Sequence, residues 1–291
     1  MSPAPPRARR AAAGPERRRR PPPRRRGRRR SELRARILAA VPAIAFAIFI
    51  IAQGGLIFAL GAIALGLICL HELYTLLADV RPVKIAGFLG LIALAFAALY
   101  GDQFQLVLVA AALVPVVFAF TVLRPVSDQP TLAMSVTLLG FWWVGLAIAH
   151  AILLREAVHG NGVLVDVLVG TFVGDTGAYF GGRAFGRRPL APRISPNKTL
   201  EGLAFGFVFA IAATWAAGLY QDWLSGGQAL LIGLGVALAA PVGDLFESLV
   251  KRDVEIKDTG RLFGAHGGAL DRLDAVLFTV PVGYYVWLAV M

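Results

Sequence analysis

The sequence predicts an all-α, polytopic integral membrane protein with about nine transmembrane helices and a cytoplasmic N-terminus. Hydrophobic residues make up 57% of the 291 residues, and the mean hydropathy of +0.67 exceeds that of a typical soluble domain. The apolar residues gather in runs close to the length that crosses about 30 Å of hydrocarbon. Backbone groups in lipid must be hydrogen-bonded within their own segment, so each run is expected to be a helix.

Residues 1–36 form an Arg- and Pro-rich tail that differs from the rest of the chain. The tail holds 15 of the 29 Lys and Arg residues and two acidic residues, Glu16 and Glu32. It offers almost no apolar surface to bury, so we expect it to be disordered, cytoplasmic and close to anionic lipid headgroups. Because the tail carries +13, residues 37–291 sum to −2. RNA or DNA binding by the tail is the less favoured alternative, so no nucleic-acid partner is expected.

Nine apolar runs divide residues 37–291, which we expect to form one multi-helix membrane domain. The runs lie at 37–52, 56–77, 85–101, 104–123, 131–154, 163–181, 200–220, 228–249 and 275–291. The first and last are short for a span, and the sixth and eighth contain acidic residues, so their boundaries stay open. Glycines recur along the sixth run and predict close packing against another helix, at Gly170, Gly174, Gly177 and Gly181.

The distribution of basic residues supports this layout, because short cytoplasmic connections collect Lys and Arg. With the tail inside, the cytoplasmic connections contain 13 Lys and Arg residues, and the outer connections contain only Arg155. Both long polar loops, 182–199 and 250–274, then lie on the cytoplasmic face. We therefore expect a multi-pass protein of the plasma membrane whose polar site faces the cytoplasm.

Four acidic residues near the ends of the predicted helices form a candidate metal site. Asp175 lies in "VGDTGAYFGG", Asp244 in "APVGDLFESLVKR", and Asp271 and Asp274 in "GGALDRLD". A carboxylate inside a membrane is costly and therefore indicates function, although a single one could simply pair with a Lys or Arg at the headgroup level. Carboxylates without a Cys or His cluster suit Mg²⁺, as one ion, two ions, or with an additional monovalent cation.

Polar residues beside these acids indicate phosphate recognition. On the eighth run, Glu247, Ser248 and Lys251 share a helical stripe with Asp244. In "PRISPNKTLEG", Lys198 is suited to contact a phosphate.

The segments that lead into the seventh and ninth runs carry further polar groups. Thr199 or Asn197 can cap the seventh run. Gly267 and Gly268 precede the last helix, where free backbone N–H groups can hold an anion beside Arg272.

Several common nucleotide and metal motifs are missing from the sequence. It contains no GxxxxGK(S/T) phosphate loop, no dinucleotide fingerprint after a strand, no CxxC pair and no HExxH helix. These absences exclude an ATPase with a soluble nucleotide domain. The single cysteine, Cys69, excludes an intrachain disulfide framework. What remains is a membrane-embedded site for metal-bound phosphates.

Residues 248–274, "SLVKRDVEIKDTGRLFGAHGGALDRLD", resemble the signature of the phosphatidate cytidylyltransferase (CDP-diacylglycerol synthase) family. The shared pattern is S-x-x-K-R, then K-D-x-G, H-G-G and a closing D-R-x-D. Upstream, "GDTGAYFGGRAFGRRPLAPRISPNKTLEG" is similar to the family's second conserved region. The resemblance is strong over residues 174–274, the expected catalytic region. Gly264-Ala265 replaces a common Pro-Gly and Ala269 replaces a larger aliphatic residue, but no charged group is lost.

The resemblance implies an enzyme of phospholipid biosynthesis that converts CTP and phosphatidic acid to CDP-diacylglycerol and pyrophosphate. The catalytic residues would be Asp244, Asp271, Lys251, Arg252 and His266. Substrate would be bound by Ser195, Asn197, Lys198, Thr199, Glu201, Ser248, Lys257, Asp258, Gly267, Gly268 and Arg272. The metal ligands would be Asp244 and Asp271, with Asp175 and Asp274 as second choices.

Other functions and the oligomeric state stay open at this point. A CTP-dependent polyprenol or phytol kinase has a similar membrane layout and would transfer the γ-phosphoryl group to an alcohol. A transporter is less suited, because its substrate residues lie near the bilayer midplane in repeated halves. The expected partners are CTP, phosphatidic acid and the lipid bilayer, and a homodimer is compatible with the sequence.

Overall fold

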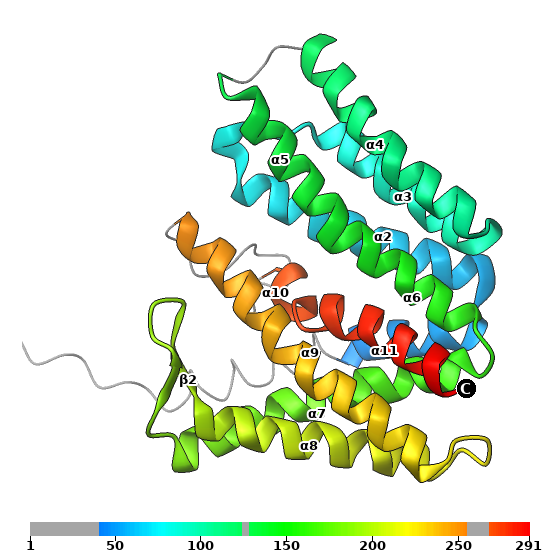
Figure 1. Cartoon of the computed structure of the whole chain (residues 1–291), viewed down its shortest axis with the longest axis vertical. Coiled ribbons are helices and arrows are strands. Elements are labelled where there is room, and N and C mark those ends of the chain that lie inside the picture. The colour runs from blue at the N-terminus through cyan, green and yellow to red at the C-terminus, as the bar shows by residue number, and fades with distance from the viewer. Residues whose placement is uncertain (1–40, 124–127, 255–267) are drawn as a thin grey trace, which may run out of the picture.

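The computed structural model describes residues 41–123, 128–254 and 268–291, and within them the chain is almost entirely helical (Figure 1). This confirms the predicted all-α membrane fold. The predicted tail, residues 1–36, lies outside the described residues.

The helices follow the predicted apolar runs closely. In chain order they are Val41–Gln53, α2 (Gly55–Leu76), the short η1 (Ala78–Val80), α3 (Lys84–Tyr100), α4 (Gln103–Leu123), α5 (Pro130–Gly140), η2 (Phe141–Gly145), α6 (Leu146–Glu156), α7 (Gly160–Phe185), α8 (Leu200–Gly218), α9 (Gly226–Asp253), α10 (Leu270–Leu273) and α11 (Val276–Val290). Among the described residues, seven helices are long and apolar enough to cross a membrane, and two shorter apolar helices accompany them. Each predicted run overlaps one of these nine helices, while the number that span the membrane stays a prediction.

The polar segment between α7 and α8 contains an element that hydropathy does not reveal. Strands β1 (Pro189–Ala191) and β2 (Ser195–Thr199) pair antiparallel there and form a hairpin at one end of the α7–α8 pair (Figure 1). Helices α7 and α9 are also longer than their apolar runs. Lys251, predicted to share a helical stripe with Asp244, and Arg252, predicted in the loop, both lie on the last turn of α9.

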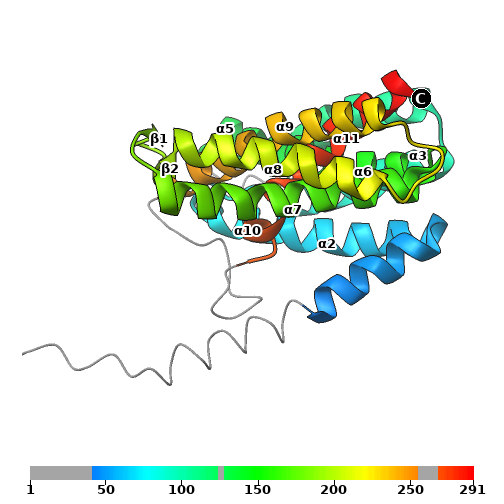
Figure 2. The ribbon, with the colours of Figure 1, turned by 90° about the horizontal axis from the view of Figure 1, so that it is seen from below.

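Helices α7, α8 and α9 pack side by side, with the hairpin at one end (Figure 2). Glycines of α7 make the close approach to α8 possible. A Cβ atom on Gly174 would lie 2.9 Å from the Ala210 side chain, and one on Gly177 would lie 2.6 Å from that of Phe209. Both distances are shorter than a normal carbon contact, so the prediction of close packing along the sixth run is confirmed.

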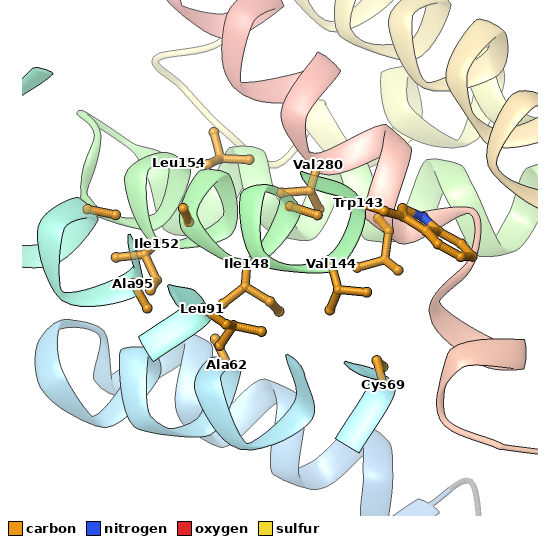
Figure 3. Packing of buried hydrophobic residues seen from close by; sticks show 14 of the residues in the cluster. Ala62, Cys69, Leu91, Ala95, Trp143, Val144, Ile148, Ile152, Leu154 and Val280 are labelled. Carbon is orange, nitrogen blue, oxygen red and sulfur yellow. The ribbon is translucent and has the colours of Figure 1, made fainter. Parts of the chain in front are cut away.

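A second group of helices, α2, α3 and α6, surrounds an apolar core. Figure 3 shows Val144 and Ile148 directed from η2 and α6 toward Leu91 of α3 and Ala62 of α2. Helix α11 contacts both α6 and α9 and so joins the two groups. Helix α2 also contacts α10, where the last span begins.

The α8–α9 interface offers a direct test of this packing. At Gly233 of α9, a Cβ atom would lie 2.9 Å from the Ile211 Cα atom of α8, where backbone cannot easily yield. We expect Gly233→Ala to destabilise the protein by about 1–3 kcal/mol. The matched control is Gly227→Ala on the same helix, where a Cβ atom meets nothing within 4 Å. Thermal unfolding in detergent should lower the midpoint for the first variant only, and equal midpoints would contradict the packing.

Candidate active site

A cavity of about 610 Å³ lies between α7, the hairpin, α8, α9 and α10. Most of the predicted polar residues line it, namely Asp175, Ser195, Asn197, Lys198, Thr199, Asp244, Asp271 and Asp274. From Gly202 to Ala210 the lining follows α8 for about 12 Å at 1.5 Å per residue. Farther along α8 and α9 from the hairpin, the lining is small or apolar and includes Phe207, Ala237 and Ala240. The cavity therefore has a charged part beside the hairpin and an apolar part between the helices.

The hairpin supplies a cation to this cavity. Lys198 of β2 forms an ion pair with Asp244 of α9. The next residue, Thr199, caps α8 by accepting a hydrogen bond from the Gly202 N–H at 3.1 Å, which confirms Thr199 as one of the two predicted caps. Because the cap fixes where β2 ends and α8 begins, it also fixes the position of Lys198.

A second ion-pair network joins α9 to Asp271, which lines the cavity. The Lys251 ammonium group pairs with Glu247 one turn earlier and with Asp271 of α10, the latter at 3.0 Å. Asp271 also accepts a hydrogen bond from the Gly268 N–H at 2.7 Å. Glu247 is only 1% exposed, and its charge would be costly to bury without the lysine. Lys251 therefore joins α9 to the start of the last span.

Three of the predicted metal ligands interact with one another electrostatically. Asp175, Asp244 and Asp274 come from α7, α9 and the junction of α10 with α11, and their negative charges repel across the cavity. Such a cluster attracts cations.

The carboxylate oxygens fit the chemistry of Mg²⁺, although they do not form a complete protein cage. In residues 41–123, 128–254 and 268–291, no group of three or more His, Cys, Asp or Glu side chains is arranged to hold one metal ion. Mg²⁺ commonly takes one or two protein carboxylates and completes its shell with water and substrate phosphates. The site could therefore hold the ion together with a phosphate substrate, so Mg²⁺ stays a prediction.

Some predicted site residues lie beside the cavity without lining it. The Arg252 Nε donates to the Ile194 carbonyl at 3.1 Å and ties α9 to the hairpin. Glu201 accepts hydrogen bonds from the backbone N–H groups of Arg187 and Arg188, at 3.0 and 3.1 Å, and closes the base of the hairpin. Direct substrate contact by Arg252 and Glu201 stays a prediction.

The remaining predicted residues have varied positions. Ser248 is half-buried on α9, Arg272 is exposed on α10, and Gly268 is buried where the last span begins. Four predicted residues lie outside the described residues, namely Lys257, Asp258, His266 and Gly267.

Sequence reasoning missed three residues that the structure brings to this region. Tyr179 and Arg183 of α7 line the cavity, and Arg183 donates to the Tyr179 hydroxyl at 3.1 Å. Their spacing from Asp175 could have predicted this, because helix positions four apart share a face, and Asp175, Tyr179 and Arg183 are four residues apart. The third residue is Glu72 of α2, which is 8% exposed and accepts two backbone hydrogen bonds from the start of the last span. The sequence could have drawn attention to Glu72, because a single acidic residue in an apolar helix indicates a specific role.

The fold and the cavity together define a multi-pass membrane protein with a charged, phosphate-suited site at the ends of its helices. Residues 34–290 match the model of the cytidylyltransferase family, and the chain belongs to that family. It is therefore a nucleotidyltransferase enzyme.

Individual relatives agree with this assignment. The chain is 31% identical over 264 residues to the phosphatidate cytidylyltransferase of Bacillus subtilis, covering 88% of this chain and 97% of that protein. It is 39% identical over 142 residues to the Mycobacterium leprae phosphatidate cytidylyltransferase, covering 49% and 46%. It is also 39% identical over 153 residues to the uncharacterized Escherichia coli protein YnbB, covering 50% and 51%. The latter two matches span about half the length of those relatives.

Proposed function

We propose that this protein is a phosphatidate cytidylyltransferase that forms CDP-diacylglycerol and pyrophosphate from CTP and phosphatidic acid. The observation that carries the proposal is the cavity itself, which combines a lysine and carboxylate groups beside the hairpin with an apolar part along α8. A triphosphate suits the charged part, and a lipid whose headgroup is a phosphate suits the junction of the two parts. The names of the Bacillus and Mycobacterium relatives support the same reaction.

The chemistry needs no strong general base. The second pKa of a phosphomonoester is about 6, so the lipid phosphate already carries an anionic oxygen at neutral pH. That oxygen attacks the α-phosphorus of CTP and forms a new P–O bond. The bond between the α-phosphorus and the bridging oxygen to the β-phosphate breaks, and its electron pair leaves with pyrophosphate. The protein's task is therefore to position two anions and to neutralise their charge.

The basic side chains are placed for this task. Lys198 and Lys251 already pair with Asp244 and Asp271, so substrate phosphates would compete with carboxylates for the two ammonium groups. Arg183, with its bond to Tyr179, lines the cavity as Lys198 does, whereas Lys251 reaches the lining through Asp271. We propose that these three residues bind phosphate oxygens, as charge-assisted hydrogen bonds of this kind are strong.

Mg²⁺ is the proposed cofactor. Asp244 and Asp271 would hold it, with Asp175 and Asp274 nearby, and when bound it would neutralise charge on the phosphates. The proposed location is the plasma membrane, with the cavity open to the cytoplasm. The basic residues of the hairpin segment and of the end of α9 support that orientation.

A substrate-dependence assay tests the proposed function. Purified protein in detergent is given CTP with or without phosphatidic acid, and with or without EDTA followed by added Mg²⁺. We expect CTP to be consumed only when lipid and Mg²⁺ are both present. No consumption of CTP under the complete condition would contradict the reaction. Full turnover in the presence of EDTA would contradict only the proposed requirement for Mg²⁺ and not the reaction.

A further inference from the structure

Glu72 lies in a place where an acid is unexpected. It is the single acidic residue of α2, an otherwise apolar span. Its Oε1 accepts a hydrogen bond from the Ala269 N–H at 3.1 Å, and its Oε2 accepts one from the Leu270 N–H at 2.9 Å. Both carboxylate oxygens are thus committed to the backbone at the start of the last span, which is 197 residues away from Glu72 in the chain.

These bonds satisfy a specific need of that backbone. The first N–H groups of a helix have no partner within the helix, and inside a membrane there is little water to replace one. A carboxylate is a strong partner, because hydrogen bonds to a charged acceptor are stronger than those between neutral groups. The fit is close, since a Cβ atom on Gly268 would collide with the Glu72 carboxylate. An alanine at position 268 would therefore displace the Glu72 carboxylate from its present place.

The same short segment places a residue of the cavity. The Gly268 N–H donates to Asp271 Oδ2 at 2.7 Å, and Asp271 lines the cavity while Glu72 does not. Lys251 approaches the Asp271 side chain from α9. Glu72 holds the backbone that leads into Asp271. Movement of residues 268–270 would move Asp271 relative to Lys198 and Asp244.

We propose that Glu72 is a positioning residue that fixes Asp271 in the cavity through the backbone of residues 268–270. This inference rests on the proposed function, in which Asp271 acts on the triphosphate. It assigns α2, which contributes no side chain to the cavity, a part in the reaction. Groups that orient a ligand without touching substrate commonly change activity by about 10- to 100-fold when they are removed.

Three variants and one control test the proposal. Glu72→Ala removes both acceptors, and Glu72→Gln keeps one acceptor but turns an NH₂ group toward a backbone N–H. Gly268→Ala pushes the carboxylate away by adding a methyl group. The control is Asp166→Asn, which changes another buried acid of an apolar helix. Asp166 accepts a hydrogen bond from the Gln221 side chain at 2.8 Å and does not line the cavity.

Two readouts separate positioning from general stability. We expect kcat for CTP per folded molecule to fall about 10- to 100-fold in Glu72→Ala and Gly268→Ala, and less in Glu72→Gln, with an unchanged KM for lipid. The melting temperature is measured on the same samples, because the loss of two buried hydrogen bonds also lowers stability. Hydrogen–deuterium exchange of the peptide that contains Ala269 and Leu270 should become faster in the same variants. The control should match the wild type in both measurements.

The failure of this proposal differs from the failure of the proposed function. If the wild type does not turn over CTP, the proposed function is wrong, while the exchange measurement still reports on the Glu72 contacts. If the wild type is active and Glu72→Ala keeps its kcat, the positioning role is overturned. A Glu72→Ala variant that loses only yield and melting temperature, with normal kcat per folded molecule, would overturn it as well.

Discussion

Replacing Asp271 by Asn will lower CTP turnover by about 10²- to 10³-fold, the usual cost of removing one group that stabilises a developing charge. Asp271 combines a bond from the Gly268 N–H with an ion pair to Lys251. Asparagine keeps an acceptor for the backbone, so the start of the last span should stay in place. It cannot balance the lysine charge or bind a cation strongly. The loss should therefore appear in activity, while the melting temperature changes little.

Asp222→Asn is the matched control for this prediction. Asp222 is exposed in the connection between α8 and α9, outside the cavity lining. Turnover is measured as pyrophosphate release by purified protein, together with thermal unfolding of the same samples. The control should retain full activity. Near-normal turnover in Asp271→Asn would contradict a role of Asp271 in the reaction.

Replacing Lys198 by Gln is expected to reduce kcat/KM for CTP by about 10²-fold. A lysine that binds a phosphate oxygen forms a charge-assisted hydrogen bond, whereas a neutral amide forms a much weaker one. In the free protein the change also leaves Asp244 without its ion-pair partner. The uncompensated carboxylate repels the incoming triphosphate, which adds to the loss.

Arg193→Gln provides the comparison for Lys198, because Arg193 is an exposed cation in the connection between the two strands and does not line the cavity. Initial rates over a range of CTP concentrations give kcat/KM for both variants. We expect a large loss of kcat/KM for Lys198→Gln and almost none for Arg193→Gln. Equal losses would mean that the hairpin acts through its overall charge, which would contradict a specific phosphate contact by Lys198.

The helices could be predicted from the sequence because a membrane leaves the chain few choices. Long apolar runs must become helices, so hydropathy alone located each helix to within a few residues. The acids were equally visible, since Asp175 and Asp244 stand out in apolar surroundings. Thr199 could be predicted as one of two candidate caps, because a side-chain oxygen acceptor is preferred at the beginning of a helix.

Other features depend on contacts that hydropathy does not describe. The hairpin is polar and short, so neither its pairing nor the Lys198–Asp244 ion pair could be read from a pattern. Helices α7 and α9 run past their apolar runs, because a helix can continue outside the hydrocarbon wherever its side chains reach polar partners. Glu72 was the hardest to predict, since its partners Ala269 and Leu270 are distant in the chain and contribute only backbone groups.

The most direct test of the central claim follows the phosphates of CTP. Purified protein is incubated with phosphatidic acid and CTP labelled at either the α- or the γ-phosphate, and the lipid and aqueous products are separated. A cytidylyltransferase acting on phosphatidic acid puts the α-label into the lipid and the γ-label into pyrophosphate. The γ-label in the lipid together with released CDP would instead identify a lipid kinase and would contradict the account.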